Sequence, residues 1–70
     1  MWKRIQGAQK ALDYLWREAP PRLARISHAL IQDAGGHWDA SRFHEADRNV
    51  TAVWMAVQRH RRLRATLAGG

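Results

Sequence analysis

The residues with the clearest chemical character are four arginines near the C-terminus, Arg59, Arg61, Arg62 and Arg64. A guanidinium stays charged at physiological pH and can donate several hydrogen bonds to a phosphate or a carboxylate. Residues 59–70 contain no acidic side chain, so this segment is strongly cationic. Basic residues in a last helical turn favour the negative end of the helix dipole, but four exceed that need. We expect the cluster to contact a polyanion or an acidic protein surface.

The helical phase of this cluster supports the same expectation. On a helical wheel, Arg61 and Arg64 continue the face that carries the apolar residues earlier in the segment. Burying an unpaired guanidinium is costly, so the helix must leave the protein body there or meet something negative. The apolar face that precedes the two arginines comprises Phe43, Ala46, Val50, Val53, Trp54 and Val57.

Other groups capable of chemistry do not form a recognisable catalytic or metal site. A zinc site needs three or four converging ligands, and the histidines pair only loosely with acidic neighbours near one connection. Residues 33–39 lack the alternating oxygen ligands of a calcium loop. Ser27 and His28 are adjacent on a helix and point in different directions, and no glycine-rich phosphate loop is present. We therefore expect no enzyme activity, no cofactor and no metal. The four histidines are His28, His37, His44 and His60.

Length and composition bound the class of protein. Seventy residues allow one domain, spanning 1–70, whose core contributes only a few kcal/mol, so we expect a second copy or a larger complex as partner. The absence of cysteine excludes disulfides and fits a reducing cytosol. No apolar run approaches the roughly 18 residues of a membrane span, and the N-terminus does not resemble a signal peptide. These features predict a cytoplasmic protein that does not bind membranes, and the net charge of +6 favours anionic partners.

Apolar spacing and helix breakers predict the first two helices. Residues at helical spacing predict a first helix over 2–18. Proline disfavours helical geometry in the residue before it, so Pro20 and Pro21 should end that helix, and Pro21 is suited to begin the next. The second helix is expected at 21–34, ending in a left-handed turn at the two glycines that follow, Gly35 and Gly36.

A third helix is expected over 39–67, long and basic at its C-terminal end. Asp39 or Ser41 can cap its N-terminus through a side-chain oxygen. The complete pattern predicts an all-α fold, a small three-helix domain with short connections and antiparallel neighbours.

Asn49 leaves one alternative open for the third segment. A break there would give helices at 40–47 and 50–66, and with the second helix a helix-turn-helix arrangement whose recognition helix is 40–47. We favour one continuous helix because the apolar face keeps its phase across Asn49.

The aromatic residues divide into expected core and expected surface. Trp16 and Trp54 lie on apolar faces, whereas Tyr14 points away from its helix's apolar face and Trp38 falls in the expected connection after the glycines. Tryptophan and tyrosine are enriched among interface hot spots, so Trp38 and Tyr14 are candidate anchors for a partner. The expected core is Ile5, Leu12, Trp16, Leu23, Ile26, Leu30, Val50, Trp54 and Val57.

Two functions fit this sequence. The first is a small basic nucleic-acid-associated protein, a regulator or accessory subunit, since an arginine-rich helix can follow phosphates. The second is an adaptor or inhibitor of the phage or plasmid type, which docks its basic helix end, with Trp38 or Tyr14, on a larger acidic protein. The residues expected to make the anionic contacts are Lys3, Arg4, Arg59, Arg61, Arg62 and Arg64.

Overall fold

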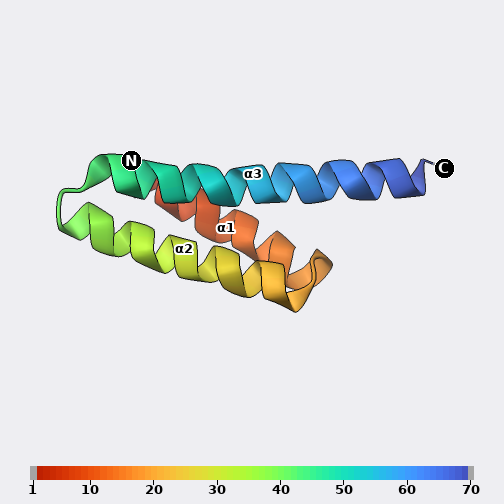
Figure 1. Ribbon diagram of the computed structural model, residues 1–70, viewed down its shortest axis with the longest axis horizontal. Coiled ribbons are helices and arrows are strands. Elements are labelled where there is room, and N and C mark those ends of the chain that lie inside the picture. Colours follow the sequence, from red (N-terminus) through yellow and green to blue (C-terminus); the bar gives the residue numbers. More distant parts are fainter. Residues whose placement is uncertain (1, 70) are drawn as a thin grey trace.

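The computed structural model describes the backbone of residues 2–69 and the side chains of residues 3–69. This part of the chain forms three helices, α1 (Trp2–Glu18), α2 (Pro21–Asp39) and α3 (Phe43–Ala68), and contains no strand (Figure 1). Each helix packs against both others. Short connections make α2 antiparallel to α1 and to α3, so α1 and α3 run in the same direction. The prediction of an all-α three-helix domain is confirmed.

The two prolines form the corner between α1 and α2, as predicted. The backbone N–H of Ala19 donates to the Leu15 carbonyl at 2.9 Å and closes the last turn of α1. Pro20 adopts an extended conformation, with φ −57° and ψ 143°, and its carbonyl accepts from the N–H of Leu23 at 3.0 Å. Pro21 begins α2, where its missing N–H leaves no helical hydrogen bond unmade.

Helix α2 does not end at the glycines, which corrects the predicted boundary. It continues through Gly35 and Gly36, neither of which has a positive φ, and ends at Asp39. The residue in the left-handed region is Ser41, with φ 60°. The extra turn brings Trp38 against the core, with its ring edge-to-face on Phe43 and 4.9 Å between centroids. This packing outweighs the cost of about 1 kcal/mol for each helical glycine.

The connection to α3 is therefore residues 40–42, and the predicted helix cap is wrong. Arg42 occupies the position before the helix, and no side chain there makes a capping hydrogen bond. The backbone turns instead through hydrogen bonds of its own, from the N–H of Ala40 to Gly36 at 3.1 Å and from the N–H of Arg42 to His37 at 2.7 Å.

Helix α3 is unbroken over 26 residues. Asn49 lies inside it, half-buried, and its Nδ2 donates to the Leu30 carbonyl at 3.1 Å, which ties α3 to α2. The alternative of two short helices, and with it the helix-turn-helix arrangement, is excluded. At 1.5 Å per residue α3 is about 39 Å long, and its C-terminal end extends past the corner between α1 and α2 (Figure 1).

The core is built from small and medium side chains. Ala8, Ala24, Ala34 and Ala46 are completely buried, so the three helices approach too closely to hold indole rings between them. The residues buried in this core are Ile5, Ala8, Leu12, Leu15, Ala24, Ser27, Ile31, Ala34, Ala46, Val50, Val53 and Val57.

Three predicted core residues are therefore misplaced. Trp16 is 48% exposed, Ile26 51% and Trp54 37%. The Trp54 ring lies over the α1 backbone at Gly7, where an added Cβ would meet its Cζ2 atom at 3.5 Å. The large rings cover the edges of the bundle rather than filling its centre. Leu23 and Leu30 are half-buried and pack against the core from its edge.

Candidate partner-binding surface

The exposed end of α3 holds both arginines and uncovered apolar side chains. Arg59, Arg61 and Arg62 are exposed, and their side chains make no hydrogen bond or ion pair to the described part of the chain. Leu63 is also exposed, and Leu67 has 82% of its surface exposed. This segment lies where α3 passes the corner of the other two helices (Figure 1), so few neighbours cover it.

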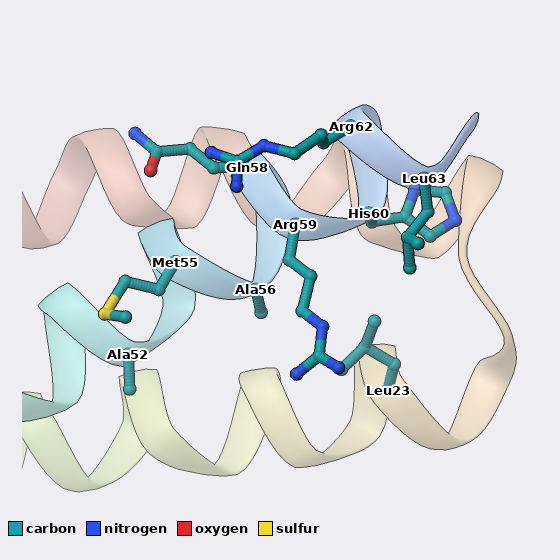
Figure 2. A pocket seen from close by; sticks show the side chains of 9 residues that line it. All are labelled: Leu23, Ala52, Met55, Ala56, Gln58, Arg59, His60, Arg62 and Leu63. Carbon is teal, nitrogen blue, oxygen red and sulfur yellow. The ribbon is translucent and has the colours of Figure 1, made fainter. Parts of the chain in front are cut away.

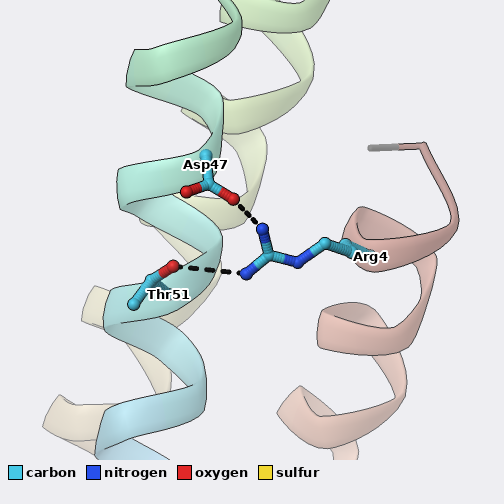
Figure 3. A network of polar contacts seen from close by, with 3 residues as sticks. All are labelled: Arg4, Asp47 and Thr51. Atoms are coloured by element: carbon cyan, nitrogen blue, oxygen red, sulfur yellow. Dashed lines mark hydrogen bonds and ion pairs between the residues drawn. The ribbon is translucent and has the colours of Figure 1, made fainter.

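Arg4 is engaged elsewhere, on the seam between α1 and α3. Its guanidinium forms an ion pair with Asp47 and donates from Nη2 to Thr51 Oγ1 at 3.3 Å (Figure 3). One fork-shaped side chain thus spans two successive turns of α3, which the planar geometry of arginine allows.

Two more contacts join α1 and α3 farther along the same seam. Arg64 forms an ion pair with Glu18, at the end of α1. Between these pairs, the Tyr14 hydroxyl is hydrogen-bonded to His60 Nδ1 at 3.0 Å, with the two rings edge-to-face. Tyr14 is half-buried against the core, so the prediction that it points outward is wrong. The side of α1 that carries Tyr14 therefore faces α3 rather than solvent.

These contacts separate the predicted partner-binding residues into those already paired within the chain and those that are not. Arg4 and Arg64 already have carboxylate partners within the chain. Lys3 lies beside Arg4, at the level of Asp47, which is 14 positions or about 21 Å along α3 from Arg61. Among the residues that the sequence singled out, this leaves Arg59, Arg61 and Arg62 as a compact group of guanidinium groups with no partner in the described part of the chain.

A groove opens between α2 and α3 next to this group, and sequence reasoning missed it. Leu23 of α2, with Met55 and Leu63 of α3, lines a volume of about 630 Å³, and Arg59 extends toward Leu23 (Figure 2). Met55 is 63% exposed, and no acidic residue lines the groove. A second row of apolar residues along α3, separate from its buried face, is the sequence pattern that could have predicted this groove. The lining residues are Leu23, Ala52, Met55, Ala56, Gln58, Arg59, His60, Arg62 and Leu63.

Trp38 lies away from this surface. It sits in the last turn of α2, not on a connection as predicted, and is half-buried beside Phe43. The C-terminal end of α2 neighbours the N-terminal end of α3, so the structure does not bring Trp38 to the arginines. The nearby His37 Nδ1 accepts a hydrogen bond from Arg42 Nε at 3.1 Å.

Comparisons with known proteins do not assign a family or a function to the chain. No protein-family model matches the chain, and no curated protein or solved structure matches it. Among the described residues, no three histidine or acidic side chains converge as metal ligands would, and no helix is sufficiently long and apolar to cross a bilayer. The surface at the end of α3 is therefore the feature that bears on function.

Proposed function

We propose that this chain is a small adaptor or inhibitor that docks on a larger acidic protein through the C-terminal part of α3. The observation that supports the proposal is the mixture of side chains there. Three free arginines, Arg59, Arg61 and Arg62, are followed within two turns by the exposed Leu63 and Leu67. Arginine beside exposed aliphatic side chains is the make-up of a protein interface, where the apolar groups are buried and the arginines pair.

Nucleic acid is the competing candidate, because the same three guanidinium groups would suit phosphates. The apolar side chains favour a protein instead. A phosphate backbone leaves Leu63 and Leu67 in water, whereas burying each leucine in an interface contributes about 1.5–3 kcal/mol. Of the four arginines at the end of α3, Arg64 is also paired within the chain, which leaves three for phosphates there.

The test is affinity capture from nuclease-treated extract, followed by identification and purification of the retained protein for direct titration. Wild type should bind this protein, and Arg61→Gln with Arg62→Gln should weaken binding about a hundredfold or more, since charged interface contacts contribute about 1.5–3 kcal/mol each. Lys3→Gln with Lys10→Gln is the matched control, because it removes the same charge from an exposed face of α1. The control should bind as wild type does.

Two results would decide against the proposal. If nuclease treatment abolishes capture, and wild type binds purified nucleic acid with a log–log salt slope that the arginine variant lowers by roughly 0.7–0.9 for each lost contact, the competing candidate is correct. If both double variants weaken binding equally, the partner responds only to net charge and the surface on α3 is not the interface.

A further inference from the structure

The groove between α2 and α3 gives this surface a definite shape, and we propose that it binds an acidic amphipathic α-helix. The inference rests on the proposed function and specifies the kind of ligand. The partner helix would lay its apolar face over Leu23, Met55 and Leu63, with carboxylates beside that face reaching Arg59 and Arg62.

The dimensions of the groove fit a short helix. Its lining on α3 runs from Ala52 to Leu63, 11 positions or about 17 Å, which is the length of about three helical turns. Ala52 and Ala56 form a low floor that lets another helix approach closely, and Met55 can adjust its shape to a partner side chain. Helix-in-groove recognition uses anchors at i, i+3, i+4 and i+7, which span about two helical turns and so fit within this length.

The electrostatics of the groove select the charge of the occupant. Arg59 and Arg62 line it, no acidic residue does, and the whole chain carries a net charge of +6. An acidic segment is attracted to this surface, whereas a second copy of the chain would bring an equal positive charge to it. Charge complementarity therefore favours a different, acidic protein over self-association.

The backbone requirements select a helix rather than an extended segment. An extended peptide laid over Leu23, Met55 and Leu63 would face apolar side chains with unpaired N–H and C=O groups. The described residues form no strand, so no sheet edge is present to satisfy those groups. A helix satisfies its own backbone and presents only side chains to the groove.

The first experiment uses a defined probe. A fluorescein-labelled peptide of about 16 residues carries leucine at i, i+3, i+4 and i+7 with glutamates beside them, and fluorescence anisotropy measures its binding to the full chain. One control peptide replaces each glutamate with lysine, and another spreads the same residues evenly around the helix. Only the acidic amphipathic peptide should bind. Equal binding of either control, or no binding of the acidic peptide, would overturn the inference.

Substitutions then locate the site. Met55→Ser and Leu63→Ser should each weaken peptide binding about tenfold, from the loss of an apolar contact. Ile26→Ser is the matched control, because Ile26 is 51% exposed but does not line the groove, and it should bind the peptide as wild type does. Arg59→Gln should flatten the salt dependence of peptide binding more than Arg61→Gln, since Arg59 lines the groove and Arg61 does not. Circular dichroism of each variant confirms that it is folded.

Other anionic ligands form part of the same test. Vesicles of phosphatidylcholine with phosphatidylserine, and a short DNA duplex, are titrated against wild type and the groove variants. If either binds more tightly than the peptide and loses affinity with Met55→Ser, the groove serves that ligand and the inference is wrong. Weaker binding that is indifferent to Met55 supports the inference, because it reflects net charge alone.

The inference and the proposed function can fail separately. A captured protein whose binding needs Arg61 and Arg62 but tolerates Met55→Ser and Leu63→Ser would preserve the docking proposal and refute the groove assignment. If extract yields no protein while the acidic peptide binds with the expected dependence on Met55, the groove assignment holds and the adaptor role fails.

Discussion

Replacing Gly35 and Gly36 with alanine tests the conformation of α2 where the sequence and the structure disagree. Both glycines are helical, and a Cβ added to either would meet no heavy atom within 4 Å. Alanine is better than glycine in a helix interior by about 1 kcal/mol, and Gly36 gains less because the helix ends at Asp39. The double variant should be more stable by about 1–2 kcal/mol. For a domain this small, each kcal/mol raises Tm by about 4–8 °C.

Thermal and urea unfolding, followed by far-UV circular dichroism, measures this difference. Gly7→Ala is the matched control because Gly7 lies inside α1, and its added Cβ would make an ordinary contact, at 3.5 Å, with Trp54. The control should gain about 1 kcal/mol. If Gly35 and Gly36 adopted the left-handed turn that the sequence suggests, alanine there would be strained and would destabilise the protein. A less stable double variant beside a more stable control would refute a helical α2 at these residues.

Three further outcomes follow from the packing. Leu15→Ala should cost about 2–5 kcal/mol because Leu15 is fully buried, and Trp54→Ala should cost less because its ring is 37% exposed; urea unfolding that gives the reverse order would contradict this core. Tyr14→Phe should cost about 1 kcal/mol in wild type and nothing in a His60→Ala background, which a double-mutant cycle measures; equal costs in both would mean the hydrogen bond contributes nothing. Arg61→Ala should change stability by less than about 0.5 kcal/mol in the same assay, since its side chain is exposed and unpaired, and a larger loss would show a structural role.

The features predicted well from the sequence are those fixed by neighbouring residues. Pro20 and Pro21 act through local geometry, so the end of α1 and the start of α2 were predictable. The unbroken α3 follows from the constant phase of its apolar face across Asn49. The exposure of the arginines at the end of α3 also agrees with the sequence, because their helical phase places them where burial would be costly.

The features predicted poorly depend on contacts between helices. A helical wheel gives the direction of Trp16 and Trp54 but not the distance between helices, which buried alanines make too small for indole rings. The partners of Arg4 and Arg64 lie 43 and 46 residues away in the chain, so no local pattern reveals them. The end of α2 was misplaced because glycine's preference is weak beside the burial of Trp38.

The extension of α3 past the other helices has a consequence for the thermodynamics of binding. The last turn is held by its own hydrogen bonds, such as that from the Gly69 N–H to Ala65 at 2.8 Å, and Leu67 packs on little else. Short helical segments without tertiary support are only marginally stable in water, so amide protons there should exchange with solvent faster than elsewhere in α3. A docked partner would slow that exchange by ordering the segment. Association would then combine folding with binding, and its heat-capacity change would exceed what the contact area alone accounts for.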